Sequence, residues 1–301
     1  MSDGASGGAD FGGGPRGRVH LADGVEVART LADESVDLVY LDPPFNTGRR
    51  QTREQLRTRR VPEGAGDGEG DRTGFGGRRY ATERLGSRSF DDGFDDYLAF
   101  LEPFLVESHR VLAPTGSLYL HLDYREVHYA KVLLDEVFGR ANFVNEIIWA
   151  YDYGARPKRR WPAKHDNILF YAKDAGRNVF NADDIERIPY MAPGLVGPEK
   201  AARGKLPTDT WWHTIVSPTG REKLGYPTQK PLGVLERIVR ASSPPGGLVA
   251  DFVAGSGTAG EAALRHGRRF VLADCSPEAF EVMRRRFAEC DGVAFCEAVE
   301  G

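Results

Sequence analysis

Residues 41–46 of this chain read Leu-Asp-Pro-Pro-Phe-Asn and combine a carboxylate, two prolines and an aromatic ring. The preceding run Val36–Leu41 is mostly apolar and β-branched, which is typical of a buried strand in a parallel sheet. Proline cannot donate a ladder hydrogen bond, so this strand must end before Pro43 and Pro44. Asp42 is therefore expected at the carboxyl end of a strand, where open α/β sheets bind their ligands.

The stiff turn would direct two hydrogen-bond acceptors, the Asp42 carboxylate and the Pro43 carbonyl, at one point beside the Phe45 ring. Such a site suits a flat group that carries an NH2, and the amine of a nucleobase is one. That amine is a poor nucleophile because its lone pair is delocalised into the ring, and accepting both N–H hydrogens returns the lone pair for attack. Stacking on Phe45 would hold the base, at roughly 1–3 kcal/mol. The alternative is a structural Asp42 that caps the turn before Pro43 and Pro44.

A glycine-rich turn at residues 255–260 (GSGTAG) follows the apolar run Leu248–Val253 and opens a predicted helix. Glycine lets the backbone approach a ligand closely, and a helix N-terminus favours a carboxylate or phosphate. Asp274 ends the next predicted strand, where an acid can hold ribose hydroxyls. An NAD-binding dehydrogenase would show the same pattern. Only 50 residues follow Asp251, however, which is too few for a doubly wound dinucleotide unit.

Both sites need a sheet to position them, and strand patterns alternate with helix patterns along the chain. The predicted strands are 19–21, 36–41, 117–122, 143–149, 167–171, 248–253 and 270–273, and the predicted helices are 25–31, 95–112, 126–138, 232–241 and one from the glycine turn to about 267. This order predicts an α/β fold with a mostly parallel sheet. Asp23 lies at the same predicted edge as Asp42, where it would either reach a ligand's adenine amine or cap the next helix.

Composition limits the class of protein. The 301 residues are 41% hydrophobic, enough for a full α/β core, and the net charge of −4 confines any basic surface to local patches. Three cysteines without CxxC spacing, and histidines without an HExxH pair, favour a reducing cytoplasm and no metal site. No run approaches the roughly 20 apolar residues of a membrane span. Residues 1–18 are Gly-rich and polar and are expected to be disordered.

Two segments interrupt the alternation and carry local positive charge. Residues 49–88 hold eleven arginines and eight glycines and carry a net charge of +5, so we expect a mobile loop that either contacts a phosphate backbone or is a solvated insertion. Residues 153–177 place seven basic side chains among aromatic ones, a mixture that suits nucleic acid but also fits a solvated face. The side chains expected to contact DNA are Asn46, Arg49, Arg50, Arg156, Lys158, Arg159, Arg160, Lys164 and His165.

Three motifs in this order, 42–45 (DPPF), 227–231 (PTQKP) and 251–258 (DFVAGSGT), resemble the β-class of S-adenosylmethionine-dependent amino DNA methyltransferases. The resemblance covers most of residues 19–290. It implies a seven-stranded, mostly parallel Rossmann-like sheet in permuted order. It also implies a catalytic half at 19–150, a target recognition region at 151–224 and a cofactor half at 225–301, after the disordered 1–18.

The resemblance implies S-adenosylmethionine as cofactor, with its adenine near Asp23, its ribose at Asp274 and its methionine near Lys230 and the glycine turn. The implied cofactor-binding residues are Asp23, Thr228, Lys230, Asp251, Phe252, Gly255, Ser256, Gly257, Thr258 and Asp274. Asp42, Pro43, Pro44 and Phe45 are the implied catalytic residues.

The implied partner is double-stranded DNA with its target base flipped out, in the cytosol and at the nucleoid of a bacterium or archaeon. Asp before Pro-Pro favours adenine-N6 over cytosine-N4 as the target. A cytosine-N4 enzyme and an inactive homologue that binds cofactor and DNA are the alternatives. The resemblance allows a homodimer, and the sequence names neither the target site nor a cognate restriction enzyme.

Overall fold

The computed structural model describes residues 14–47, 49–60, 72–73, 79–92, 94, 96–154, 157–217, 220 and 222–297. The chain forms two compact units. Unit 1 comprises the chain up to Phe45 and from Asp96 onward, and unit 2 comprises Asn46–Asp95. Within the described ranges no helix is long and apolar enough to cross a membrane.

Unit 1 is built on one sheet whose strands lie in the order β12-β1-β11-β10-β2-β6-β8-β7-β9. These strands are β1 (Gly17–Leu21), β2 (Val36–Leu41), β6 (Leu112–Leu122), β7 (Phe143–Ala150), β8 (His165–Ala172), β9 (Thr210–Trp212), β10 (Leu248–Asp251), β11 (Arg269–Asp274) and β12 (Val293–Cys296). All neighbours are parallel except β8, which is antiparallel to both β6 and β7. The predicted α/β class and permuted, mostly parallel order are confirmed. The described sheet has nine strands where seven were expected, because the short strands β12 and β9 extend its two edges.

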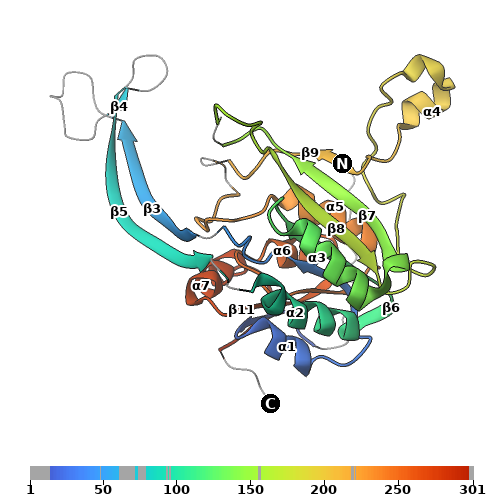
Figure 1. Cartoon of the computed structure of the whole chain (residues 1–301), viewed down its shortest axis with the longest axis horizontal. Helices are drawn as coiled ribbons and strands as arrows, with labels where there is room; N and C mark the ends of the chain where they lie inside the picture. The colour runs from blue at the N-terminus through green and yellow to red at the C-terminus, as the bar shows by residue number, and fades with distance from the viewer. Residues whose placement is uncertain are drawn as a thin grey trace, which may run out of the picture. The chain divides into compact units, whose positions relative to one another are not determined.

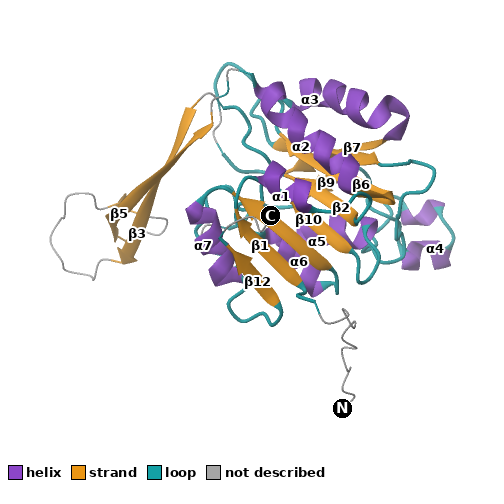
Figure 2. Cartoon of the chain, turned by 90° about the horizontal axis from the view of Figure 1, so that it is seen from below, coloured by secondary structure: helices purple, strands orange, loops and turns teal. Residues whose placement is uncertain are grey.

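Helices cover both faces of this sheet (Figures 1 and 2). The α-helices of unit 1 are α1 (Gly24–Thr30), α2 (Tyr97–Val111), α3 (Val127–Leu134), α4 (Pro198–Arg203), α5 (Leu232–Ser242), α6 (Thr258–Arg265) and α7 (Pro277–Arg286), with a π-helical turn at Asp135–Gly139 and 3-10 turns at Arg140–Asn142 and Pro193–Leu195. Successive β11 residues show the two faces. Phe270 and Leu272 pack in the core that holds α5, α6 and α7, whereas Val271 and Ala273 pack with Val27 of α1.

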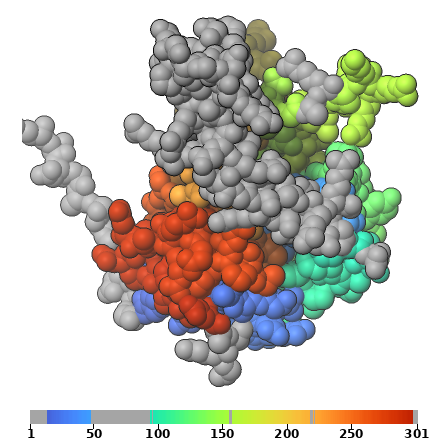
Figure 3. All heavy atoms as spheres, turned by 90° about the vertical axis from the view of Figure 1, so that its left-hand side faces the viewer, coloured from blue at the N-terminus to red at the C-terminus, as the bar shows by residue number. Residues whose placement is uncertain are grey.

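The last part of the chain joins the first part inside the sheet. Strand β10 lies parallel to β2, with Val249 opposite Leu38 and Ala250 opposite Val39, and β1 lies between β11 and β12. Figure 3 shows the same junction on the surface, where blue N-terminal and red C-terminal segments adjoin. Because parallel strands end at one edge, this pairing brings the ends of β2 and β10 together.

Pairing on both sides explains one correction at the N-terminus. Gly17 and Arg18, expected to be disordered, belong to β1 and pair with strands on either side. Residues 1–13 lie outside the described residues. The expected recognition region 151–224 contains the predicted strand 167–171, which is β8 and lies between β6 and β7 in the central sheet.

Unit 2 corrects the expectation of an unstructured segment at residues 49–88. Strands β3 (Arg49–Arg60) and β5 (Arg79–Asp92) form an antiparallel pair, and β4 (Arg72–Thr73) adds to the edge of β5. An antiparallel pair satisfies its backbone hydrogen bonds locally, so it needs less apolar burial than the composition argument assumed. Residues 61–71 and 74–78 lie outside the described residues.

Candidate active site

Asp42 directly follows β2, at the carboxyl edge of the sheet, as predicted. Tyr97 of α2 fixes the turn that follows by donating a hydrogen bond to the Pro44 carbonyl, at 2.8 Å. Lys230 Nζ lies 2.8 Å from Asp42 Oδ1 and 4.7 Å from the centroid of the Phe45 ring. Asp42 Oδ1 is buried, and in the described part of the chain this ammonium is its close partner. The ammonium therefore balances the charge of the carboxylate.

The glycine turn lies on the neighbouring strand end, after β10. Gly255 and Gly257 have φ of +51° and +75°, which favours glycine, and a Cβ on Gly255 would lie 2.9 Å from the Tyr226 ring. Thr258 donates a hydrogen bond from its hydroxyl to the Lys230 carbonyl, at 3.3 Å. The turn is thereby tied to the loop whose Lys230 side chain reaches Asp42. The structure thus brings the two predicted motifs to one site.

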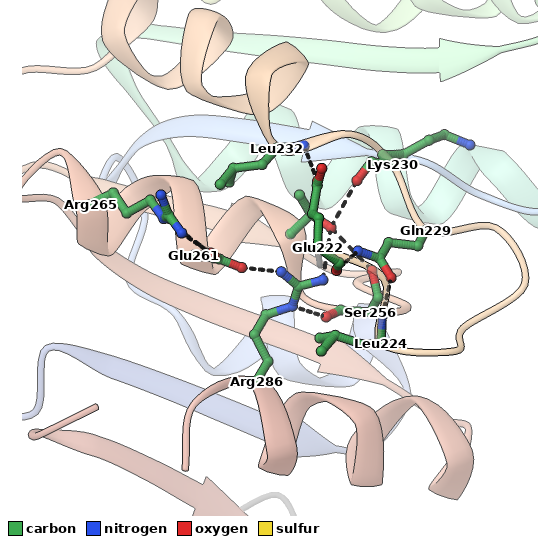
Figure 4. A network of polar contacts seen from close by, with 10 residues as sticks. Glu222, Leu224, Gln229, Lys230, Leu232, Ser256, Glu261, Arg265 and Arg286 are labelled. Carbon is green, nitrogen blue, oxygen red and sulfur yellow. Dashed lines mark hydrogen bonds and ion pairs between the residues drawn. The ribbon is translucent and has the colours of Figure 1, made fainter. Parts of the chain in front are cut away.

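Arg286 of α7 braces the glycine turn from inside the protein (Figure 4). Its side chain is 3% exposed and pairs with Glu261 of α6. It also donates hydrogen bonds to the Ser256 carbonyl at 2.6 Å and to Thr258 Oγ1 at 3.3 Å. Burial lowers the pKa of Arg286, and the Glu261 carboxylate opposes that shift. The sequence reasoning missed this brace.

The loop before α5 is held by a second polar network, also drawn in Figure 4. Gln229 is buried; its amide donates to the Glu222 carbonyl at 2.7 Å and its oxygen accepts from Leu224 N at 2.9 Å. The Glu222 carboxylate accepts from Leu232 N at 2.5 Å and so caps the first turn of α5. These contacts fix the backbone from which Lys230 extends.

Two further carboxylates lie at the same edge of the sheet. Asp251 is 3% exposed, and burial, with the charges of Asp42 and Asp274 in addition, raises its pKa well above the usual range despite a hydrogen bond from Val253 N and the Lys230 charge. Burial also raises the pKa of Asp274, which accepts from Gly255 N and Ser276 N at 2.8 and 2.9 Å.

Other predicted cofactor residues lie in different surroundings. Asp23 caps α1 by accepting from two backbone N–H groups, as its structural alternative predicted. Thr228 is exposed, whereas Ser256 and Thr258 are buried with their hydroxyls 3.1 Å apart. The Phe252 side chain is buried in the protein. The roles assigned to these residues stay predictions.

A series of buried side-chain hydrogen bonds lies close to Asp42, and the sequence did not predict it. His121 of β6 contacts Tyr40 through Nδ1 and Asp166 through Nε2, and Asp166 accepts from Tyr151. A histidine and an aspartate inside apolar strands do indicate that hydrogen-bond partners exist, because buried polar groups are hydrogen-bonded. The described residues contain no cluster of metal-binding side chains.

The predicted DNA-contacting residues lie in two places. Asn46 accepts a hydrogen bond from Phe94 N at 3.1 Å. Arg49 and Arg50 begin β3 of unit 2, and Arg156 lies outside the described residues.

The others belong to the loop 151–164 or to the first residue of β8. This loop leaves the sheet at the carboxyl edge, because Leu122 of β6, a strand parallel to β2, pairs with Asn167. Lys158, Arg159 and Arg160 are exposed, and His165 is half-buried. Lys164 donates to the carbonyls of Tyr153 and Gly154, at 2.6 and 3.0 Å, and so closes the base of the loop.

An open, mostly parallel α/β sheet with a buried carboxylate and a glycine turn on adjacent strand ends is typical of enzymes that bind a nucleotide-like ligand. The family model N6_N4_Mtase, described as DNA methylase, matches residues 36–285. The chain therefore belongs to the family of amino DNA methyltransferases, which use S-adenosylmethionine.

Relatives support this family. The chain is 26% identical to the type II methyltransferase M.HpaI of Haemophilus parainfluenzae, over 89% of this chain and 73% of that protein. It is 28% identical to the DNA adenine methyltransferase YhdJ of Escherichia coli K12, over 88% of this chain and 80% of that protein.

Solved structures support the fold. A DNA modification methylase of Thermus thermophilus, TTHA0409, solved with S-adenosyl-L-methionine, has a TM-score of 0.57 and 21% identity over 94% of this chain and 99% of that one. The cytosine-N4-specific PvuII DNA methyltransferase has a TM-score of 0.58 and 14% identity over 95% of this chain and 99% of that one. The fold is thus shared with a cytosine enzyme.

The side chains at this edge fit the methionine end of S-adenosylmethionine, which carries an ammonium and a carboxylate. The buried Asp251 carboxylate has its pKa raised by burial, so a bound ammonium would stabilise its charged form. Lys230 and the N-terminus of α6 offer positive charge for a carboxylate. Gly255 and Gly257 have positive φ and close neighbours, so a side chain at either position would fill the space beside the turn where a ligand could bind.

The Arg286 brace generates a stability prediction. We expect Arg286→Met to lower the free energy of unfolding by about 2 kcal/mol, because the Ser256 carbonyl and Glu261 lose a buried donor while Glu261 keeps Arg265. S-adenosylmethionine affinity should fall as the glycine turn loosens. Urea unfolding and titration calorimetry measure the two effects.

Arg265→Met is the matched control, since Arg265 pairs with the same Glu261 but has a side chain that is 56% exposed. We expect it to cost less than about 1 kcal/mol. Equal effects of the two variants would show that the buried position of Arg286 is irrelevant.

Proposed function

We propose that this chain methylates the N6 amine of adenine in double-stranded DNA, on a base flipped out of the duplex. The observation that carries the proposal is the position of the Lys230 ammonium. It lies against the Asp42 carboxylate and over the Phe45 ring, so an N–H donor at this spot meets an acceptor and an aromatic face together. Adenine carries such a donor on a flat ring that can stack.

In this proposal the chain's residues bind and orient the amine. Asp42 and the Pro43 carbonyl accept its hydrogens, and Phe45 stacks on the ring. The cofactor supplies an electrophilic methyl group on a positively charged sulfur. Transfer of that methyl group would leave the sulfur neutral and put the positive charge on the amine nitrogen beside the Asp42 carboxylate, which favours that shift. The nitrogen would then lose one proton to water. Positioning and charge placement supply the rate.

The fold alone does not separate adenine from cytosine, because the cytosine-N4-specific PvuII enzyme shares it. Support for adenine comes from Asp before Pro-Pro and from the relative YhdJ, named an adenine methyltransferase. An inactive homologue is disfavoured by the convergence of Asp42, Lys230 and the glycine turn.

The deciding experiment is incubation of the purified chain with tritiated S-adenosylmethionine and mixed-sequence duplex DNA, followed by digestion to nucleosides. We expect the label in N6-methyldeoxyadenosine. Label in N4-methyldeoxycytidine would move the assignment to that base, and label in RNA or protein alone would reject a DNA substrate.

Asp42→Asn tests the acceptor. We expect kcat to fall about 100-fold or more, because an amide can turn a donor toward the amine and carries no charge. Cofactor affinity, measured by calorimetry, should be retained. Asp37→Asn is the control, since Asp37 is on the same strand and accepts from Leu248 N at 2.8 Å, away from the site. Unchanged turnover in Asp42→Asn would remove this residue from the mechanism.

The loop 151–164 tests the DNA surface. Besides its basic residues it presents Trp161, which is 93% exposed and available to stack on a base. Replacing Lys158, Arg159 and Arg160 with Ala should weaken DNA binding and reduce the slope of log K against log salt by about 2–3, at roughly 0.9 per phosphate contact. Fluorescence anisotropy over a salt series measures the slope.

Three arginines at the amino edge of the sheet provide the control. Arg265 ends α6, Arg269 begins β11 and Arg285 lies in the last turn of α7, and their replacement removes the same charge. We expect this triple variant to keep the wild-type slope. Equal slopes for both triple variants would make the loop's position unimportant.

A further inference from the structure

The His121 ring is fully buried at the back of the candidate site. Its centroid lies 5.8 Å from that of Phe45, 6.2 Å from that of Tyr40 and 5.4 Å from that of Trp149. Nε2 lies 3.2 Å from Asp166 Oδ2, and Nδ1 lies 2.7 Å from the Tyr40 hydroxyl and 3.9 Å from Asp42 Oδ1. Each ring nitrogen therefore has one hydrogen-bond partner, and Asp42 lies just beyond Nδ1.

The partners determine where the protons are. Burial opposes ionisation of Asp166, yet the hydrogen bonds from His121 and Tyr151 and the charge of Lys230 lower its pKa. An ionised carboxylate accepts hydrogen bonds and cannot donate them, so His121 Nε2 must carry a proton. In the neutral ring, Nδ1 is then an acceptor, and the Tyr40 hydroxyl must point its hydrogen at Nδ1. Burial, with the charges of Asp42, Asp251 and Asp166, raises the pKa of Tyr40, so the hydroxyl keeps this hydrogen.

The same proton arrangement keeps the protein's neutral donors off Asp42. With Nδ1 unprotonated and the Tyr40 hydrogen directed at it, neither group offers a donor to Asp42 Oδ1, which in the described residues has the Lys230 ammonium as its partner, at 2.8 Å. A proton on Nδ1 would instead face Tyr40 and Asp42 together. It would then compete with an incoming amine for the same oxygen.

We propose that His121 is a positioning residue for the target amine. Asp166 fixes the tautomer of His121, and the tautomer directs the Tyr40 hydroxyl to Nδ1. Asp42 Oδ1 then receives no donor from these two residues, so Lys230 is the partner that an N–H of the base has to replace. The His121 ring also packs against the Phe45 ring, with the centroids 5.8 Å apart. This inference rests on the proposed amino-group methylation, but its central statement concerns the free protein.

The tautomer can be read without any activity. In protein labelled with ¹⁵N-histidine, long-range ¹H–¹⁵N spectra distinguish protonated from unprotonated ring nitrogens. The signal of His121, one of seven histidines, is the one missing from His121→Gln. We expect a protonated Nε2 and an unprotonated Nδ1 in the free protein. A proton on Nδ1, alone or on both nitrogens, would overturn the proposal even if the enzyme is fully active.

Kinetics then test the consequence. Asp166→Asn lets an amide donate to Nε2 and so shifts the proton toward Nδ1, and Tyr40→Phe removes the hydroxyl that contacts Nδ1. We expect kcat to fall about tenfold or more in each variant, the scale of one altered hydrogen bond at the reacting group. KM for DNA and for cofactor should change less than about twofold.

Tyr119→Phe is the matched control for Tyr40→Phe. Tyr119 lies opposite Tyr40 in the sheet and is equally buried, and it loses a comparable bond to Ser242 Oγ, 2.7 Å long. Its kcat should stay within about twofold of wild type. A shifted tautomer in Asp166→Asn with unchanged kcat would overturn the positioning role. A wild-type chain that methylates no DNA base would refute the proposed function instead, and the ¹⁵N spectrum would still decide the tautomer.

Discussion

The ion pair between Lys230 and Asp42 is the contact on which the candidate site depends. It joins the end of β2 to the loop before α5, and so joins the two halves that the β10–β2 pairing brings into one sheet. Both side chains are mostly buried, at 12% and 14% exposed, so forming the pair costs desolvation that offsets much of its attraction. Stability alone therefore does not account for an ion pair at this position. The need for a hydrogen-bond acceptor at the strand end, Asp42, with its charge balanced by Lys230, does account for it.

Much of this arrangement could be predicted because it follows from local rules. The strand Val36–Leu41 was predicted to the residue, since the following prolines end a ladder sharply. The convergence of Asp42 with the glycine turn follows because the carboxyl ends of parallel strands share an edge. The edge strands β9 and β12 are short and carry little pattern of their own, and the β3–β5 pair is stabilised by ladder bonds that composition does not reveal.

The supporting residues could not be predicted from spacing, because their partners are distant in the chain. His121 reaches Tyr40 across 81 positions and Asp166 across 45, and Arg286 reaches the glycine turn across 30. Alternation along a strand indicates which face a residue occupies, but it does not name the partner. A buried polar residue in an apolar strand does indicate that a partner exists. In this fold His121 and Arg286 contact the site residues, near Asp42 and at the glycine turn, that the local rules predicted.

The position of Lys230 has a consequence for the order of binding under the proposed function. Its ammonium occupies the contacts with Asp42 and Phe45 that a base amine would need, so the base must displace it. Moving an ammonium away from a mostly buried carboxylate is costly unless another anion receives it. Thr258 of the glycine turn is hydrogen-bonded to the Lys230 backbone, so a carboxylate bound at that turn would lie close to the loop that carries Lys230. A cofactor bound first would thus give the Lys230 ammonium a second partner and open Asp42 to the base. Under this scheme the base binds only after the cofactor has bound.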